Sequence, residues 1–383
     1  LRYTSQGSCA RIQHTGSVTD NLLVYKPADV CARNQRWDDL GVRNKSGRPG
    51  VVRRIFRKGR YLMSDLREPS KIRVVFMGTP DVALPVLDAL SNEGYQIIGV
   101  YTRRDRRAGR GRQMAESPVK TLALERGIPV FQPASLLSDE AARAKLIELN
   151  PDVIVVAAYG LFLPSEILEL PPLGCLNIHP SLLPRHRGPS PVTTAILEGD
   201  AETGVSLMKL DEGMDSGPIL AQRPSPIGED ENTESLTSQL FEMGAQLLIK
   251  ILPDWADDKI NAVPQDDSRV TITRLLERAD GEIDWSHPAS EIARKVRAFH
   301  PWPGTFTTWN KKVLKVIEAQ SSSASTSDYV PGSVIQTDDR RPEVVTGNGA
   351  LTLQTIQLEG RKAVAASEFI LGYQDFVGSR LGS

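Results

Sequence analysis

The stretch CLNIHPSLLPRHRG, residues 175–188, places two polar side chains at the end of an apolar run. Asn177 and His179 are two residues apart, so on a β-strand both side chains lie on the same face of the sheet. Polar groups at the end of a buried strand need either hydrogen-bond partners or a functional role. An amide and an imidazole at this spacing offer one ligand a neutral donor and a proton carrier.

A carboxylate follows in the loop DEGMDSG, which comes after a later apolar strand. In open parallel sheets ligands bind at the carboxyl ends of the strands, so we expect Asp215 to approach His179 there. The three groups suit acyl transfer to an amine, with one group stabilising the oxyanion and another managing the proton of the amine. Spacing alone fits structural polar groups about equally well, and an Asp in a Gly-rich loop is also typical of a turn.

The composition is that of an ordinary soluble protein. The chain has 383 residues, which is long for one domain, with 40% hydrophobic and 24% charged residues. No apolar run approaches the ~18–20 residues of a membrane span. The three cysteines and five scattered histidines give neither a disulfide framework nor a metal-ligand spacing. We therefore expect a cytoplasmic protein without a metal site.

The charge of the chain changes near Met63. Residues 1–62 hold 13 basic and 4 acidic residues, whereas the remainder holds 33 basic and 43 acidic residues. The first segment shows no apolar periodicity, so we expect residues 1–70 to form a disordered extension, with the natural start at Met63. The alternative is an Arg-rich presequence, which would place the protein in a mitochondrion or plastid.

Beyond residue 71 apolar strands alternate with helices. Strands are expected at 71–78, 95–102, 128–133, 151–160 and 174–179, and a long amphipathic helix at 233–255. Continuously apolar strands alternating with helices predict an α/β domain over residues 71–255, with a Rossmann-like, mostly parallel sheet. A polar linker is expected at 256–275. Residues 276–383 are rich in short strands and predict a small antiparallel β-barrel of the oligonucleotide-binding (OB-like) type.

An Arg-rich segment, RRDRRAGRGRQ at 103–113, follows the second expected strand. Its six Arg residues and two glycines indicate a mobile basic loop that can contact the phosphates of a nucleic acid. A solvated basic loop is the alternative. The first turn between strand and helix, GTP at 78–80, lacks the glycine pattern of dinucleotide sites, which argues against a nucleotide cofactor.

The motifs NIHPSLLPRHRG, AAYGLFLP and GMDSGPIL together resemble those of the folate-dependent formyltransferases. The stretches FMGTPDVALPVLDAL, DRRAGRGRQMAESPVK and RAFHPWPGTF extend this resemblance over residues 71 to about 380. The resemblance implies that the catalytic trio is Asn177, His179 and Asp215. It also implies that tetrahydrofolate contacts the turn formed by Ser181, Leu182, Leu183 and Pro184.

The same resemblance implies a reaction and its partners. The formyl group would pass from 10-formyltetrahydrofolate to the α-amine of methionine on initiator tRNA, for translation initiation. Arg110 would contact the tRNA near its reacting end, and the C-terminal barrel would bind the tRNA further along. We expect a monomer that binds folate and tRNA and does not associate with a membrane.

Other functions share parts of this pattern. A nucleotide-sugar formyltransferase would have the same kind of catalytic site and a similar second domain. A purine-pathway formyltransferase would lack the Arg-rich loop and the barrel. A deformylating hydrolase could use the same trio. A noncatalytic tRNA-binding protein is the alternative outside catalysis, and the intact trio argues against it.

Overall fold

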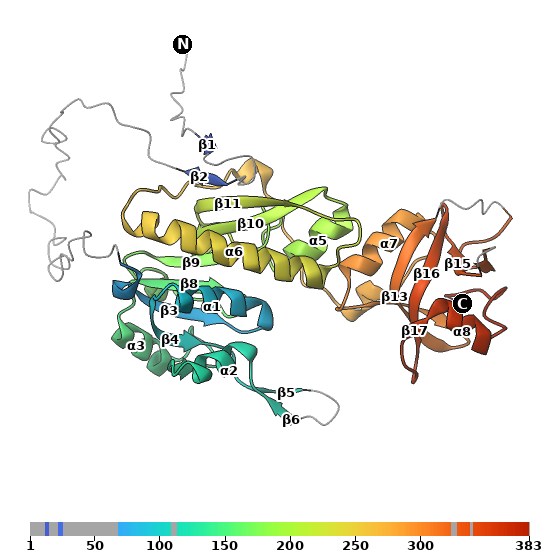
Figure 1. Cartoon of the computed structure of the whole chain (residues 1–383), viewed down its shortest axis with the longest axis horizontal. Helices are drawn as coiled ribbons and strands as arrows, with labels where there is room; N and C mark the ends of the chain where they lie inside the picture. The colour runs from blue at the N-terminus through green and yellow to red at the C-terminus, as the bar shows by residue number, and fades with distance from the viewer. Residues whose placement is uncertain are drawn as a thin grey trace, which may run out of the picture.

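The computed structural model describes residues 12–14, 22–25, 68–108, 113–322, 328–337 and 340–382. Figure 1 shows an α/β part and a smaller β-rich part that follow one another along the long axis of the molecule. The expected start at Met63 and the predicted RNA contact Arg110 lie outside the described residues. Within the described ranges, no helix combines the length and apolar character needed to cross a bilayer.

The α/β part is built on one sheet with the strand order β1-β2-β11-β10-β9-β8-β3-β4-β7. Its parallel strands are β3 (Arg73–Gly78), β4 (Gln96–Tyr101), β7 (Val130–Phe131), β8 (Val153–Ala157) and β9 (Cys175–His179). The sheet continues with antiparallel strands β10 (Glu202–Lys209) and β11 (Ile219–Pro226). Every residue of β8 is buried, as expected for an apolar strand with helices on both faces. This confirms the predicted Rossmann-like sheet.

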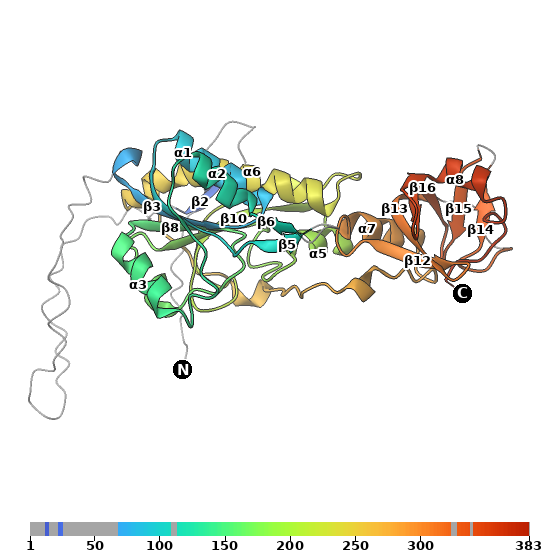
Figure 2. The same cartoon turned by 90° about the horizontal axis from the view of Figure 1, so that it is seen from below.

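Helices cover both faces of this sheet. Figure 2 shows α1, α2 and α6 on one face and α3 on the other. The helices of this part are α1 (Leu84–Asn92), α2 (Pro118–Glu125), α3 (Glu140–Leu149), α4 (Ser165–Leu168), α5 (Pro191–Glu198) and α6 (Thr233–Ala256). The one-turn helix η3 (Asp81–Ala83) precedes α1. The observed bounds of α6 agree with the predicted helix at 233–255.

The packing of α6 on β9 determines which side chains of β9 face the site. A Cβ atom on Gly244 would lie only 2.4 Å from Cγ2 of Ile178, so α6 needs a glycine to approach the strand this closely. Leu176 and Ile178 therefore belong to the core beneath α6. The alternation of a strand turns Asn177 and His179 to the opposite face, as the sequence predicts.

Two short strands of the N-terminal segment extend the sheet. β1 (Ile12–His14) pairs with β2 (Leu23–Tyr25), and β2 pairs antiparallel with β11. Leu22 and Val24 are buried in the main core. The prediction of disorder throughout residues 1–70 is therefore wrong for these strands, because two apolar side chains at alternate positions suffice to cover a sheet edge.

The β-rich part is a curled antiparallel sheet with the order β12-β13-β16-β15-β14 and with β17 paired to β16. Its strands are β12 (Thr305–Trp309), β13 (Lys312–Ser322), β14 (Val334–Gln336), β15 (Pro342–Val345), β16 (Ala350–Leu358) and β17 (Val364–Ala365). Helices α7 (Ala289–Ala298) and α8 (Ala366–Gly372) pack against it. Trp309 makes edge-to-face contacts with Phe369 and Phe376, at centroid distances of 5.6 and 5.2 Å. The predicted small antiparallel barrel is confirmed.

The two parts share an apolar interface. Ala298 and Phe299 at the end of α7 belong to one buried cluster with residues of α5 and α6, namely Val192, Ile196, Leu236 and Leu240. The Thr233 hydroxyl donates to the backbone oxygen of Ala298 at 2.5 Å. The predicted linker contains the short helix η4 (Asp267–Arg269) and is followed by η5 (Arg278–Gly281). Figure 2 shows this stretch running along the α/β part toward the β-rich part.

Candidate active site

His179 ends β9, and its side chain is almost fully buried. Its Nε2 lies 3.0 Å from the backbone oxygen of His186. A carbonyl oxygen can only accept a hydrogen bond, so Nε2 carries a proton and Nδ1 is the ring position that faces the site. Nδ1 lies 3.6 Å from Oδ2 of Asp215. The predicted proximity of His179 and Asp215 is confirmed.

Asp215 reaches His179 by another route than the one predicted. β10 is antiparallel to β9, with Lys209 opposite Leu176, so the loop after β10 starts beside the beginning of β9 and not at its carboxyl end. Leu210 packs against the core on the α3 side of the sheet, which is the face that carries His179. The loop therefore folds back across this face. The expectation of strand ends meeting at one edge was wrong, because it assumed that β10 was parallel.

Backbone geometry holds Asp215 in place. Its φ of +49° lies in the left-handed region, which Asp tolerates better than most residues. The N–H of Gly188 donates to Oδ2 of Asp215 at 2.9 Å. A Cβ atom on Gly217 would lie 1.9 Å from the backbone oxygen of Lys209, so the loop needs glycine to fold back this tightly.

Asn177 lies on the same face of β9 as His179 and is half-buried. Its backbone pairs with Val156 of β8 and Met208 of β10, which places it in the middle of the sheet. Among the residues that the structure describes, its side-chain amide has no hydrogen-bond partner. The amide N–H is therefore free to donate to a ligand.

The Ser-Leu-Leu-Pro turn divides its side chains between the interior and the surface. The Ser181 hydroxyl is buried and donates to the backbone oxygen of Arg185 at 2.7 Å. Leu183 is buried in a small apolar cluster. Leu182 and Pro184 are partly exposed. The predicted contact between this turn and folate stays a prediction, and the geometry leaves Leu182 and Pro184 as the side chains that can make it.

Two buried polar residues that the sequence analysis did not identify support this turn. The Ser206 hydroxyl donates to the backbone oxygen of Ser181 at 2.6 Å and accepts from the N–H of Leu183 at 3.0 Å. The Gln222 amide donates to the backbone oxygen of Leu183 at 2.9 Å and to the Ser206 hydroxyl at 2.8 Å. The available signal was a single polar residue in each of two otherwise apolar stretches, VSLM and ILAQ.

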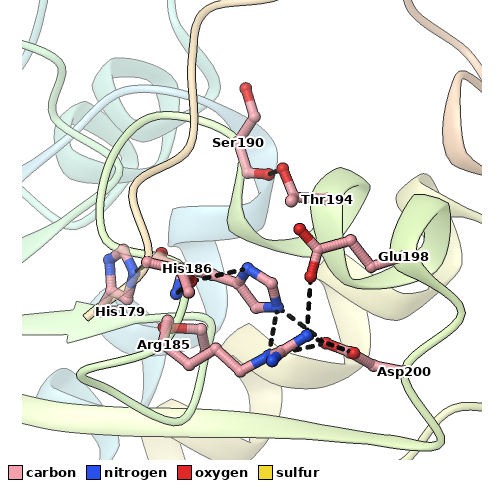
Figure 3. A network of polar contacts seen from close by, with 9 residues as sticks. His179, Arg185, His186, Ser190, Thr194, Glu198 and Asp200 are labelled. Carbon is pink, nitrogen blue, oxygen red and sulfur yellow. Dashed lines mark hydrogen bonds and ion pairs between the residues drawn. The ribbon is translucent and has the colours of Figure 1, made fainter. Parts of the chain in front are cut away.

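The loop that follows β9 carries Arg185 and His186, which form a charged network with Glu198 and Asp200 (Figure 3). His186 is buried, and its Nε2 lies 2.7 Å from Oδ2 of Asp200. The guanidinium of Arg185 donates to Asp200 at 2.6 Å and to Glu198 at 2.7 Å. Ligand atoms of His186, Glu198 and Asp200 lie close enough together to hold a metal ion, but Arg185 already supplies a cation to both carboxylates. The network fixes His186, whose backbone oxygen accepts from His179.

The Arg-rich segment contains β5 (Arg106–Ala108) and ends at the first residue of β6 (Gln113–Ala115), and these two strands pair as a hairpin. Figure 1 shows the hairpin projecting from the α/β part. At its base Asp105 accepts from Lys120 at 2.6 Å and from Gln132 at 2.8 Å. The hydrogen bond from Lys120 holds the pKa of Asp105 below its usual range. The base of the hairpin follows β4, whose carboxyl end lies beside those of β3 and β7.

Comparison with known proteins identifies two matching regions. Residues 70–252 match the family described as formyl transferase, and residues 275–374 match the formyl transferase C-terminal domain. The chain is 49% identical over 312 residues to a methionyl-tRNA formyltransferase of Roseiflexus sp. strain RS-1, covering 81% of this chain and 95% of the relative. It is 45% identical over 312 residues to the methionyl-tRNA formyltransferase of Methylococcus capsulatus, covering 82% and 100% of the two chains.

Solved structures with low sequence identity share the fold. WlaRD, a sugar 3N-formyl transferase, has a TM-score of 0.55 at 18% identity and covers 76% of this chain and 99% of its own. HypX from Aquifex aeolicus in complex with tetrahydrofolic acid has a TM-score of 0.53 at 18% identity. That match covers 80% of this chain and 48% of HypX, so this chain spans about half the length of HypX.

Proposed function

Because the chain belongs to the formyl transferase family, we propose that it transfers the formyl group of 10-formyltetrahydrofolate to the α-amine of methionine on initiator tRNA. The relatives that are 44–49% identical over about four fifths of the chain are named methionyl-tRNA formyltransferase. The observation that carries the proposal is the pair of buried His179 and half-buried Asp215 on the same face as the free amide of Asn177.

The three side chains have separate roles in this reaction. 10-Formyltetrahydrofolate supplies the formyl group when it is bound. The Asn177 amide donates toward the formyl oxygen, which gains negative charge when the amine attacks. The pair His179–Asp215 receives the proton that the amine releases and returns it to the leaving nitrogen, so no proton is gained or lost overall. No covalent intermediate with a Ser or Cys is needed, because the amine itself is the nucleophile.

We propose that the flat ring of the folate binds beside these groups. Leu182 and Pro184 are partly exposed beside the trio. The side chain of Phe162, which follows the carboxyl end of β8, is 73% exposed. Apolar side chains next to a few convergent polar groups are typical of a site for a small organic ligand. A pterin ring has this combination of flat faces and hydrogen-bonding edges.

The tRNA contacts are proposed for two elements. The β5–β6 hairpin belongs to the Arg-rich part of the chain and leaves the sheet after β4, so we propose that Arg110, which lies between these two strands in the sequence, serves the reacting end of the tRNA. The β-rich part, residues 276–383, binds the tRNA further along, and residues 256–275 connect it to the catalytic domain, residues 71–255. We propose a cytoplasmic monomer, in line with the bacterial sources of the relatives. Light scattering tests the oligomeric state.

A side-by-side assay tests this function. The protein is incubated with 10-formyltetrahydrofolate and, separately, with Met-tRNA, glycinamide ribonucleotide, an aminosugar nucleotide or no acceptor. We expect formylation of Met-tRNA alone. Formylation of the sugar nucleotide in place of Met-tRNA would refute the proposal, and release of free formate without an acceptor would identify a hydrolase. Asn177→Ala serves as the matched inactive control.

A further inference from the structure

Residues 262–273, which the sequence predicts to be part of a simple linker, lie as a strap against the loops of the active site. At one end Val263 and Ile219 exchange two backbone hydrogen bonds of 2.8 Å, which attach the strap to β11. Near the other end the N–H of Arg187 donates to the oxygen of Thr271 at 2.9 Å, and the N–H of Thr273 donates to the oxygen of Arg187 at 2.7 Å. The strap is therefore fixed on both sides of the site.

Gln265 lies in the middle of the strap and contacts the loop that carries Asp215. Its Nε2 donates to the backbone oxygens of Asp215 and Gly217, both at 2.8 Å. Its Oε1 accepts from Nε of Arg187 at 2.9 Å. Arg187 is buried, so water has limited access to its side of the bond to Gln265. One amide thus connects the loop of Asp215 to the loop that follows β9.

The position of the Asp215 carboxylate depends on both of these loops. Its 3.6 Å distance from Nδ1 of His179 is longer than a hydrogen bond, so His179 does not fix it in this state. The bond that does fix it comes from the N–H of Gly188, on the loop that Gln265 joins through Arg187. The backbone of Asp215 has a positive φ, which surrounding contacts must maintain.

We infer that Gln265 is a positioning residue for the reaction, which holds the backbone of Asp215 so that its carboxylate faces Nδ1 of His179. This inference rests on the proposed function, because it assumes that the carboxylate of Asp215 takes part in the reaction. A shift of about 1 Å in such a group costs on the order of 100-fold in rate. The linker between the two parts of the molecule is in this way also a component of the active site.

Two substitutions remove the bonds that Gln265 donates, and they differ in what they do to the bond from Arg187. Gln265→Met keeps the length of the side chain and removes both polar groups. Gln265→Glu keeps an oxygen that can accept from Arg187. It replaces the amide nitrogen by a second oxygen, which cannot donate to the backbone oxygens of Asp215 and Gly217. The matched control is Ser268→Ala, because Ser268 lies in the same strap, is exposed, and donates through its hydroxyl to Asp266 within the strap itself.

We expect kcat to fall by roughly 10- to 100-fold in both Gln265 variants, with KM for the folate and for Met-tRNA within about threefold of wild type. The control should keep wild-type kcat. Unchanged kcat in both Gln265 variants would overturn the inference. So would a rise in KM at constant kcat, since that pattern reports lost binding of substrate and not lost positioning.

A double-mutant cycle separates positioning from damage to the fold. If Gln265 acts only through Asp215, adding Gln265→Met to Asp215→Asn should cost less than about twofold further in single-turnover rate. Full additivity of the two losses would contradict the inference. If Asp215→Asn and Asp215→Ala themselves retain wild-type turnover, the proposed function fails. If both lose it while the Gln265 variants do not, only the role of Gln265 fails.

Discussion

Nδ1 of His179 lies 3.6 Å from Oδ2 of Asp215, while Nε2 of the same ring is held by the backbone oxygen of His186. A ring flip would break the second contact, so Nδ1 is the ring nitrogen available to exchange a proton in the proposed reaction. A proton added to Nδ1 would form a charge-assisted hydrogen bond to Asp215 after a movement of less than about 1 Å. In the proposed reaction the pair would therefore hold the proton of the amine between attack and release.

The first prediction concerns the trio. Asn177→Ala, His179→Ala and Asp215→Ala should each lower kcat by roughly 10²–10⁴, the usual scale for an oxyanion donor or a positioned acid or base. The losses should not add in a triple variant, because the groups act on the same step. Steady-state kinetics measure the losses, and circular dichroism serves as the check on folding. Near-wild-type turnover in any two folded variants would remove the trio from the mechanism.

Cys175 gives a prediction for pH dependence. The thiol is buried, and burial raises its pKa from about 9 to about 12. The thiol releases its proton more easily in the unfolded chain than in the folded protein. Its contribution to the free energy of unfolding should therefore be fully present below pH 9 and should be lost as pH rises from about 9 to about 12. Cys175→Ala should lose stability less steeply over this range. Denaturant unfolding of both proteins at a series of pH values measures the difference, and equal profiles would contradict it.

The same burial predicts low reactivity. In a Cys9→Ser, Cys31→Ser background, Cys175 is the remaining thiol of the chain. It should not react with a thiol reagent at pH 8 in the native protein and should react completely in denaturant. Rapid labelling of the native protein would show that the strand β9 opens to solvent.

The sequence predicted the elements that have regular apolar patterns. The continuously apolar strands and the long helix α6 each carry many residues of one period, so errors at single positions do not matter. The face of Asn177 and His179 was predictable because alternation is local. The direction of β10 was not, since an antiparallel partner and a parallel one have similar apolar content. The fold class could therefore be predicted from the sequence, whereas the path by which the chain brings Asp215 to His179 could not.

The polar contacts of the site were harder to predict. Gln265 lies in a polar stretch without a period, and its partners are residues 187, 215 and 217, which are distant in sequence. The strand β2 was missed for a related reason. Three residues are too few to show an alternating pattern. The burial of Leu22 and Val24 depends on the edge of β11 beside them, and the sequence alone does not show that pairing.

The N-terminal strand gives a stability prediction. Leu22→Ala and Val24→Ala should each lower the free energy of unfolding by about 1–3 kcal/mol, because both side chains are buried in the core against the edge of the sheet. Leu23→Ala is the control, since Leu23 is only half-buried and points to the other side of the strand. Removal of residues 1–62 should lower the melting temperature. An unchanged melting temperature would show that the strand contributes no stability.

The last prediction concerns the RNA contacts. Arg110→Ala removes one guanidinium that can hold a phosphate in bidentate fashion, and it should lower both tRNA affinity and kcat if the contact also positions the amine. Lys315→Ala, on the exposed side of β13 in the β-rich part, should lower affinity and leave kcat unchanged. Each lost phosphate contact should flatten the slope of log K against log salt by about 0.7–0.9.

Point variants are better suited to this test than removal of residues 276–383, because removal would strip Ala298 and Phe299 from their apolar contacts with α5 and α6. The control is Lys145→Ala, which removes the same charge from α3, where Lys145 pairs with Glu148. Affinity is measured across a salt series, and folate binding by fluorescence. Folate affinity should not change in any of the three variants. If Arg110→Ala leaves tRNA affinity, salt slope and turnover at the level of Lys145→Ala, the Arg-rich hairpin does not contact the RNA, and its charge serves solvation alone.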